Sequence, residues 1–404
     1  MPRSLPTFYT IRFDPGGSTR RFAVTKAVIV GGGIGGLTAA ISLRRIGVDA
    51  VVLEKAGELW EIGAGISLWV NAMKALERLG LADEVRATGR EEIGGEIRLS
   101  GGETLSEIPA DALEERFGRN VVLQRPDLQR VLLAALGEAG GVVRLGAECL
   151  GFRQGDASVT ALLVGGREER GDLLIGADGL SSVIRKQLFG DEEPRYAGFT
   201  AWRGLADLGD GWDGDGFEAW GRGSIFGLVG LGRGRFYWYA TKNAPEGQPD
   251  APEGRKAELL RRFGSWHEPV PSAIRATEET EILRNDVYDR EPLNRWGEGR
   301  VTLLGDAAHP MTPNLGQGAC QAIEDAVVLA ECIRYGNGDV QAALQLYEEG
   351  RRARTAGVVR RSRLLGRVGQ LENPLLCAMR NAAARAMPLR LQLRQLDPIL
   401  GYEV

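Results

Sequence analysis

A glycine-rich turn between an apolar run and a helical pattern is the feature that most constrains how this chain of 404 residues can fold. The apolar run 26–30 leads into Gly-Gly-Gly-Ile-Gly-Gly at residues 31–36. In that spacing Gly31 permits a tight turn, Gly33 lets the backbone approach a pyrophosphate, and Gly36 lets a helix pack closely on the strand. The turn therefore predicts an α/β fold that binds a dinucleotide.

The residues after the turn agree with this prediction. An apolar stripe at helical spacing would face the sheet; it consists of Leu37, Ala40, Ile41 and Leu43. Glu54 closes the next apolar run, 50–53, about where an acidic side chain meets a ribose hydroxyl. A carboxylate there disfavours a 2′-phosphate, so NADP is not expected at this site.

A second glycine-rich stretch lies about 270 residues further on. The apolar run 300–304 leads into Gly305-Asp306, and the segment 313–318 then reads Pro-Asn-Leu-Gly-Gln-Gly before another helical pattern. Both stretches would point the N–H groups of a helix start at an anion. Two such sites in one chain predict a cofactor that is held at each end.

Composition excludes several other classes of protein. The net charge of −4 does not indicate a nucleic-acid or anionic-membrane partner. The four cysteines are scattered and only two histidines accompany them, which argues against a disulfide framework or a zinc site and for a reduced cytoplasm. No apolar run is long enough to span a bilayer. Residues 1–22 contain no continuous apolar core, so we interpret them as a flexible leader.

The order of patterns predicts two domains and a helical end. Strands and helices alternate up to about residue 188, with helices at 71–79 and 126–139 and a strand at 172–175 that feeds Asp178-Gly179. Short aromatic and β-branched runs between 195 and 286 then predict an antiparallel sheet, with strands at 199–202, 224–229, 235–241 and 281–287. We expect a discontinuous dinucleotide domain at 23–194 and 295–335, an inserted substrate domain at 195–294, and C-terminal helices at 336–404.

Three motifs occur in the order found in a known family: Gly31-x-Gly33-x-x-Gly36, Asp178-Gly179, and Gly305-Asp306 with Pro313. The chain resembles the class A flavoprotein monooxygenases, the single-component FAD hydroxylases and epoxidases related to 4-hydroxybenzoate hydroxylase. Segments 61–68, 201–204 and 313–318 resemble the branch of urate, salicylate and 3-hydroxybenzoate hydroxylases and zeaxanthin epoxidases. The resemblance implies an α/β, Rossmann-like FAD domain of the glutathione-reductase type with an inserted antiparallel sheet and C-terminal helices.

The resemblance also implies a role for each matching residue. The pyrophosphate would lie on Gly31, Gly33, Gly35 and Gly36, and the adenosine on Glu54, Lys55 and the backbone at Cys149. Ser67, Arg125 and Asp178 would line the FAD groove, and Asp306 would bind the ribityl chain. Gly316, Gln317 and Gly318 would face the pyrimidine side of the flavin, where a helix start stabilises the negative charge of the reduced ring. Pro313 would lie over the flavin beside the substrate.

Several of these residues have a plainer interpretation. Asp306 could be an ordinary helix cap, Arg125 a surface arginine, and Asp178-Gly179 a simple turn. His309 could cap or pack rather than catalyse. The arginines at 351, 352, 354, 360, 361, 363 and 367 are interpreted as a solvated helical face.

The resemblance implies an enzyme that uses FAD, NAD(P)H as a transient reductant, and O2, which it activates as a C4a-hydroperoxyflavin to hydroxylate or epoxidise a small aromatic or apolar substrate. The predicted substrate pocket consists of Trp202, Phe226, Leu228, Tyr237 and Tyr239. Arg203 would orient an anionic substrate or else pair with an acidic neighbour. Urate is disfavoured because 224–226 offers no arginine. We expect a cytoplasmic monomer or homodimer without a bound metal; the alternative is a flavin dehydrogenase or reductase for an isoprenoid-type substrate.

Overall fold

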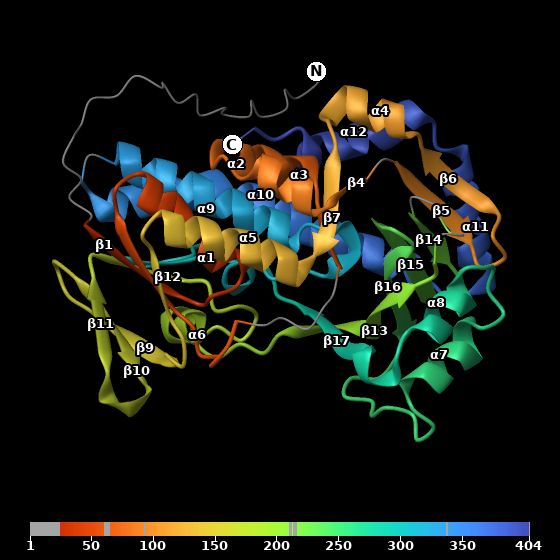
Figure 1. Cartoon of the computed structure of the whole chain (residues 1–404), viewed down its shortest axis with the longest axis horizontal. Helices are drawn as coiled ribbons and strands as arrows, with labels where there is room; N and C mark the ends of the chain where they lie inside the picture. Colours follow the sequence, from red (N-terminus) through yellow and green to blue (C-terminus); the bar gives the residue numbers. More distant parts are fainter. Residues whose placement is uncertain are drawn as a thin grey trace, which may run out of the picture.

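The computed structural model describes residues 25–59, 65–92, 94–209, 212, 216–336 and 338–403. The predicted leader, 1–22, and the start of the 61–68 segment lie outside these residues. Two sheets at opposite ends organise the rest of the chain, with helices packed between and around them (Figure 1).

The first sheet is parallel and has five strands in the order β18-β12-β1-β2-β8. These strands are β1 (Lys26–Val30), β2 (Asp49–Leu53), β8 (Val142–Arg144), β12 (Leu173–Gly176) and β18 (Val301–Leu303). Their side chains are almost all buried, as expected for parallel strands that are covered on both faces. This sheet confirms the predicted Rossmann-like fold.

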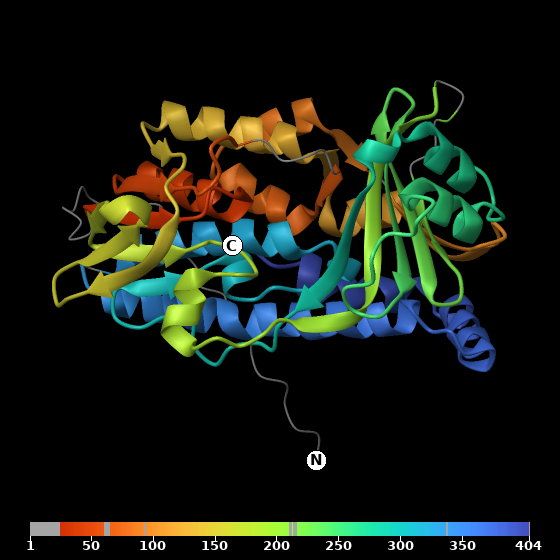
Figure 2. The ribbon, with the colours of Figure 1, turned by 90° about the horizontal axis from the view of Figure 1, so that it is seen from below.

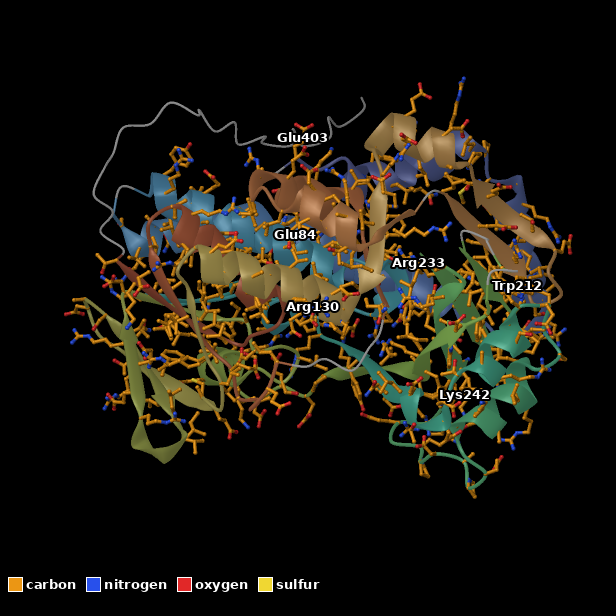
Figure 3. The ribbon with its side chains drawn as sticks, in the orientation of Figure 1. Glu84, Arg130, Trp212, Arg233, Lys242 and Glu403 are labelled. Carbon is orange, nitrogen blue, oxygen red and sulfur yellow. The ribbon has the colours of Figure 1, made fainter. Side chains whose placement is uncertain are left out.

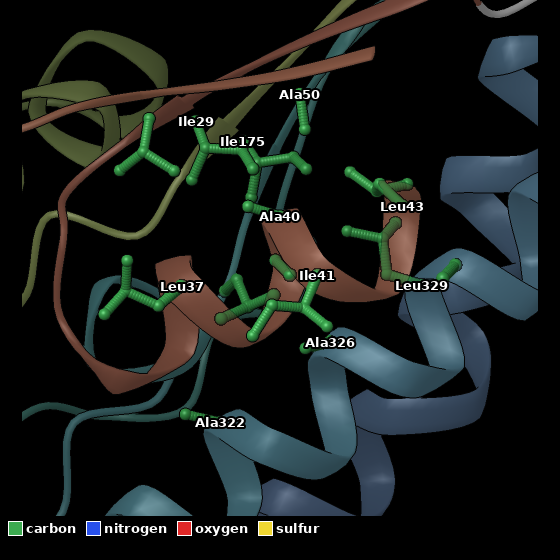
Figure 4. Packing of buried hydrophobic residues seen from close by; sticks show 14 of the residues in the cluster. Ile29, Leu37, Ala40, Ile41, Leu43, Ala50, Ile175, Ala322, Ala326 and Leu329 are labelled. Atoms are coloured by element: carbon green, nitrogen blue, oxygen red, sulfur yellow. The ribbon is translucent and has the colours of Figure 1, made fainter. Parts of the chain in front are cut away.

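Helices cover one face of the parallel sheet. Helix α1 (Ile34–Arg45) packs against α9 (Gly318–Tyr335) and α5 (Arg125–Glu138). All four residues of the predicted α1 stripe are fully buried, and Figure 4 shows them between the strand residues Ile29 and Ile175 and the α9 residues Ala326 and Leu329. The small alanines on α1 and α9 allow the two helices to approach closely.

A three-stranded antiparallel sheet lies against the other face (Figure 1). It consists of β9 (Cys149–Gln154), β10 (Val159–Leu163) and β11 (Glu168–Gly171). Helix α6 (Val183–Phe189) packs beside β9. A second small sheet, in the order β3-β7-β4, lies toward the inserted sheet; its strands are β3 (Gly65–Leu68), β7 (Asn120–Gln124) and β4 (Arg90–Glu92).

The inserted sheet has seven strands in the order β17-β13-β16-β15-β14-β5-β6. They are β13 (Arg195–Asp207), β14 (Gly216–Trp220), β15 (Ser224–Gly232), β16 (Arg235–Asn243), β17 (Leu283–Asp289), β5 (Gly95–Leu99) and β6 (Thr104–Ile108). The four strands expected from the sequence are present. Strands β5 and β6 were not expected here, because they come from the segment that we assigned to the dinucleotide domain.

Helices α7 (Arg255–Phe263) and α8 (Val270–Ala276) cover the outer face of this sheet. Lys242 of β16 forms an ion pair with Glu258 of α7 on that side, and Figure 3 labels Lys242 there. The turn 279–281, at the start of the strand predicted for 281–287, is a 3-10 helix that precedes β17.

The remaining helices lie around this frame. Near β3 and β7 the chain forms α2 (Val70–Arg78), α3 (Ala82–Thr88) and α4 (Ala110–Phe117). The C-terminal part forms α10 (Val340–Gly369), α11 (Pro374–Ala386) and α12 (Leu389–Leu400). Figure 2 shows α10 running along the molecule from the parallel sheet to the seven-stranded sheet.

Candidate functional site

Four neighbouring parallel strands deliver the predicted cofactor residues to one edge of the sheet. Strands β18, β12, β1 and β2 are adjacent and parallel, so their carboxyl ends meet at this edge. Gly31 follows β1, Glu54 follows β2, Asp178 follows β12 by two residues, and Asp306 follows β18 by three. The carboxyl edge of an open parallel sheet is where such folds bind ligands.

The first glycine turn requires two of its glycines on steric grounds. Gly31 has φ +110°, and a Cβ there would lie 2.3 Å from the carbonyl oxygen of Ala177. A Cβ on Gly36 would lie 2.0 Å from the carbonyl oxygen of Gly31, so only glycine lets α1 start so close to the turn. These contacts support the roles that the motif predicts for both residues.

Gly33 and Gly35 face different surroundings. A Cβ on Gly33 would meet no atom within 4 Å, so the start of α1 is open to a ligand at this point. A Cβ on Gly35 would lie 2.7 Å from Leu304 and 3.1 Å from Ala322. Gly35 therefore allows close packing of α1 against α9, a role the sequence did not suggest.

Glu54 lies beside the turn, as expected for a residue at the adenosine end. Its carboxylate accepts hydrogen bonds from the backbone N–H groups of Gly32 (2.7 Å) and Ala56 (2.8 Å). The segment leading to Cys149 is close by, because the N–H of Ala147 donates to the carbonyl of Glu54 at 2.8 Å. The Cys149 thiol is buried, which raises its pKa, so only its backbone remains a candidate contact. Lys55 is exposed.

Asp178 has a structural role in the described contacts. Its carboxylate accepts hydrogen bonds from the Ser182 hydroxyl (2.5 Å) and from the N–H groups of Val183 (2.8 Å) and Ile184 (3.3 Å). These bonds cap α6, which is the simple-turn interpretation of this motif. The turn still borders the cofactor edge, because the backbone of Ala177 touches Gly31.

The second glycine stretch brings Asp306 to the start of α9. Asp306 lies in the 3-10 turn Gly305–Ala307, and its Oδ1 would be 3.8 Å from a Cβ on Gly318, the first residue of α9. Gln317 is buried, and its side chain is held by Asn71 and Gln321. Pro313 and Gly316 are exposed on the same loop.

Asp306 is an exposed residue among buried neighbours. The residue is exposed to solvent while Gly305, Ala307, Ala308 and His309 beside it are buried. Desolvation by the surrounding protein nevertheless raises the pKa of the Asp306 carboxyl, and His309 and Arg125 oppose this shift. No hydrogen bond from the residues that the structure describes reaches this carboxylate. An exposed but poorly solvated acceptor suits a hydroxyl-bearing ligand such as a ribityl chain.

The small sheet β3-β7-β4 adds the remaining predicted cofactor residues. Ser67 lies on β3, Arg125 begins α5 directly after β7, and the thiol of Cys320 on α9 contacts the carbonyl of Ser67 at 3.7 Å. The sequence did not suggest Trp69, whose buried indole N–H would lie 2.8 Å from a Cβ on Gly316 and has no partner among the described residues. A tryptophan just before a helix gives no sequence signal of its own.

Arg203 and two tyrosines lie on the inner face of the seven-stranded sheet. The Tyr237 hydroxyl lies within hydrogen-bonding reach of the Arg203 guanidinium; burial raises its pKa, and Arg203 and Arg125 lower it. The ring of Tyr237 also covers Gly65 of β3, where a Cβ would be 2.4 Å from it. Arg203 forms no ion pair with any acidic residue in the described part of the chain. The seven-stranded sheet thus approaches the predicted cofactor residues through the neighbouring side chains of Arg203, Tyr237 and Arg125.

The other three predicted pocket residues lie on the opposite face of the sheet from Arg203. Trp202, Phe226 and Leu228 are buried on the outer face, where they pack with Leu259 of α7 and Ile274 of α8. The reason is the alternation of side chains along a strand, which sends Trp202 and Arg203 to opposite faces. Only Tyr237 and Tyr239 share the face of Arg203.

The inner face carries an acidic residue, Glu218, that was not predicted from the sequence. Arg203, Tyr239, Gly227 and Glu218 form one row across β13, β16, β15 and β14. The ring of Tyr239 lies over Gly227, and its hydroxyl donates to the Glu218 carboxylate at 2.5 Å. Burial raises the pKa of Glu218, while hydrogen bonds from Trp220 and Tyr239 lower it. The alternation in 216–220 could have predicted this strand.

Comparison with known proteins decides which family has this arrangement. The family model described as "FAD binding domain" matches residues 24–362. The aurachin C monooxygenase/isomerase of Stigmatella aurantiaca is 45% identical over 362 residues, which is 89% of this chain and 94% of that protein. The chain belongs to the class A flavoprotein monooxygenases.

Two further relatives are less similar to this chain in sequence. The zeaxanthin epoxidase of an Oncidium hybrid is 36% identical over 374 residues, and the chain spans about half of its length, 56%. The crystal structure of Klebsiella pneumoniae HpxO complexed with FAD and uric acid superposes with a TM-score of 0.87 at 32% identity, covering 93% of this chain and 96% of HpxO. The protein is therefore an FAD-dependent monooxygenase.

The described residues fit FAD at each end. The open start of α1 beside Glu54 suits the ADP half, and the exposed Asp306 with the start of α9 suits the flavin half. No group of side chains among the described residues is arranged to hold a metal ion. No helix in the described part of the chain is long and apolar enough to cross a membrane.

A buried ionic cluster lies behind the second glycine stretch of this monooxygenase. Arg351 of α10 is fully buried and bonds Asp325 (2.6 Å) and Glu324 of α9. Asp325 also bonds His309 (2.6 Å) and the N–H of Gly305 (3.1 Å). Glu324 is linked through Asn71 to Gln317. The cluster therefore reaches both ends of the loop 305–317, which is predicted to bind the flavin.

The cluster corrects our interpretation of the α10 arginines as a solvated face. Arg351 is buried, and Arg354 is largely buried between Glu324 and the carbonyls of Pro398 and Ile399. Arg363 is paired with the buried Asp289. Only Arg360, Arg361 and Arg367 of the series are exposed as expected. His309 is packed in the cluster, in line with its plainer interpretation.

Proposed function

We propose that the protein uses NADH or NADPH to hydroxylate a small, negatively charged aromatic compound. The balanced reaction consumes one NAD(P)H, one proton and one O2, transfers one oxygen atom to the substrate and releases the other as water. The FAD would supply reduction and oxygen activation when bound. The described residues would bind and orient the substrate and exclude water from it.

The proposed class of substrate rests on one observation, the environment of the Arg203 side chain. Its guanidinium faces the cofactor edge, is only partly exposed, and has a tyrosine hydroxyl rather than a carboxylate beside it. A partly desolvated cation without an anionic partner is unfavourable, and an anionic substrate would relieve this cost. We propose that Arg203 holds the substrate's anionic oxygen and that Tyr237 fixes the guanidinium.

Pro313 and Tyr239 would complete the pocket. Pro313 is exposed on the loop before α9, and we propose that it lies over the flavin beside the substrate, as the family motif implies. Tyr239 donates a hydrogen bond to Glu218, and it lies on the same face of the sheet as Arg203, where we propose that its ring lines the substrate pocket. We further propose that Gly31, Gly33, Glu54, Lys55, Ser67, Arg125, Cys149 and Asp306, with the 316–318 backbone, contact FAD as the family motifs imply.

The cellular setting belongs to the same proposal. All four cysteines are free thiols, which fits a reduced cytoplasm. We propose a cytoplasmic enzyme that acts as a monomer or homodimer.

A substrate panel tests the proposal. Aromatic acids, phenols, urate, aurachin C and an uncharged polyene would each be incubated with NADH or NADPH in air, and oxygen uptake and product mass would be measured. The proposal expects stimulated NAD(P)H oxidation and a mass gain of one oxygen atom for an aromatic anion. Turnover of the polyene alone would refute the proposed substrate class.

Arg203→Met then tests the binding role. This change keeps the apolar stem and removes the charge, so binding of the aromatic anion should weaken by roughly 2–5 kcal/mol. Arg235→Met, an exposed arginine on the same sheet, is the matched control and should leave binding unchanged. An unchanged KM in Arg203→Met would show that Arg203 does not hold the substrate.

A further inference from the structure

The C-terminal helices differ in charge from the rest of the molecule. Residues 360–396 contain eight arginines, no lysine and a single acidic residue, Glu372, although the whole chain carries a net charge of −4. The net charge thus averages a basic end and an acidic remainder. Such segregation points to an anionic partner for the basic end.

Five of these arginines are exposed, and no ion pair joins them to any residue that the structure describes; they are Arg360, Arg361, Arg367, Arg390 and Arg394. The other three are engaged within the fold. Arg363 pairs with Asp289, Arg385 pairs with Glu103, and Arg380 lies over the ring of Trp220. The five exposed arginines therefore remain available to an external anion.

The same helices expose large apolar side chains. Leu375 and Met379 of α11 are 69% and 61% exposed, and Leu376 is 46% exposed. Positions 375, 379, 382 and 386 follow helical spacing, and all four carry Leu, Met or Ala. Leu389 and Leu391, in the first turn of α12, are also exposed. We name Leu375, Leu376, Met379, Leu389 and Leu391 the C-terminal patch.

The opposite side of α11 is firmly attached to the protein. Cys377 and Arg380 are buried, Arg380 donates to the carbonyl of Gly369 at 3.0 Å, and Ala384 packs with Trp220 and Ile225 of the inserted sheet. Figure 1 places α11 at the edge of the molecule beside β6. The helix is therefore a rigid outer element with one anchored side and one apolar side.

We propose that the C-terminal patch and its five exposed arginines dock the protein on the surface of an anionic lipid membrane. Leucine and methionine side chains would enter the boundary between headgroups and acyl chains, and the arginines would bind lipid phosphates. Because α11 does not span a bilayer, the attachment is peripheral.

Charge argues against a second copy of the chain as the occupant. A two-fold symmetric contact would place the same basic surface opposite itself, and its arginines would repel one another. An acidic protein would satisfy the arginines, but two adjacent exposed leucines and a methionine are better satisfied by a lipid phase. Docking would also bring a membrane within one helix of the sheet that carries Tyr239 and Glu218.

Vesicle sedimentation of the full-length, FAD-loaded protein tests the proposal. The probes are vesicles of pure phosphatidylcholine and vesicles of phosphatidylcholine mixed with phosphatidylglycerol. The protein should sediment with the anionic vesicles at low salt, bind the neutral ones much more weakly, and be released as salt rises. Equal binding to both kinds of vesicle, or binding to neither, would overturn the proposal.

Paired variants assign the binding to the patch. Leu375→Gln with Met379→Gln should reduce binding at least tenfold, and each of Arg390→Gln and Arg394→Gln by about fivefold. The matched controls are Leu150→Gln on β9, where Leu150 is 63% exposed, and Arg45→Gln at the end of α1, and both should bind as the wild type does. Circular dichroism and FAD content check that the variants are folded.

Two further outcomes would replace the membrane with another occupant. A concentration-dependent dimer that the Leu375→Gln, Met379→Gln variant abolishes, without vesicle binding by the wild type, would make the patch a self-interface. Binding to poly-glutamate without binding to anionic vesicles would assign it to an acidic protein. Either result would refute docking on lipid.

Discussion

Replacing Arg351 by methionine should destabilise the protein more than any exposed substitution on the same helix. Arg351 is fully buried and donates to Asp325, Glu324 and Gln321. Methionine keeps an apolar stem of similar length, so the change removes charge and hydrogen bonds with little loss of volume. Glu324 keeps Arg354, and Asp325 keeps His309, but both carboxylates lose their shared cation.

The expected size follows from the burial of the cluster. Removing one partner of a buried ion pair costs about 3–5 kcal/mol, because the remaining charge stays desolvated. This is a large part of the roughly 5–15 kcal/mol by which proteins are stable. Since Asp325 accepts from Gly305 and Glu324 reaches Gln317 through Asn71, the loss should also loosen the loop 305–317, which we propose binds the flavin.

Urea unfolding of the FAD-loaded protein, followed by tryptophan and flavin fluorescence, measures both effects. Arg360→Met is the matched control, because Arg360 is an exposed arginine of the same helix and should change stability by less than about 0.5 kcal/mol. A cycle with Glu324→Gln should show a coupling energy of at least about 1 kcal/mol. An Arg351→Met protein within about 1 kcal/mol of the wild type would refute the argument from desolvation.

Three other predictions follow from single residues. Asp306→Ala should weaken FAD binding by roughly 1.5–3 kcal/mol in a fluorescence titration, and unchanged affinity would reduce Asp306 to a cap. Burial alone would raise the pKa of Asp325, but His309 and Arg351 outweigh it and lower that pKa to about 2. The ionised Asp325 carboxylate should therefore contribute about 2–3 kcal/mol to the free energy of unfolding above pH 4, and this contribution should be lost as pH falls toward 2. Asp325→Asn should remove this loss from a curve of stability against pH. Glu218→Gln should raise KM for the aromatic substrate without changing FAD affinity. The control Glu107→Gln, at an exposed glutamate, should change neither quantity. A Glu218→Gln enzyme with unaltered KM would contradict a role in substrate binding.

The cofactor edge could be predicted from the sequence because its signals are local. A glycine turn after an apolar strand encodes its own geometry, and parallel strands bring their carboxyl ends together whatever the rest of the chain does. Gly31, Gly36 and Glu54 therefore lie together as predicted. The role of Gly35 could not be predicted, since its neighbours Leu304 and Ala322 come from a distant part of the chain.

The inserted sheet was predicted less well because its faces are set by pairing. Consecutive aromatic residues such as Trp202 and those at 236–239 look like one pocket in sequence, but alternation divides them between a core and a site. Strands β5 and β6 join the sheet across more than a hundred residues, and nothing local marks that pairing. The division of the chain into domains stays a prediction, and the seven-stranded sheet contains strands from two separate segments of the chain.

The arginines of α10 show how one residue type can have opposite roles on one helix. Arg351 lies in the buried stripe with Tyr347, Thr355 and Val358, at spacings of three and four residues, so position could have marked it as internal. The charge of Arg351 alone led us to interpret it as exposed to solvent, because its partners Glu324 and Asp325 lie on another helix. Near the end of the same helix Arg360, Arg361 and Arg367 are exposed without an ion pair to any described residue. The first arginine holds the loop 305–317 through Asp325 and Glu324, and the later ones are exposed, so one α-helix connects the proposed cofactor site to the face that we propose meets the membrane.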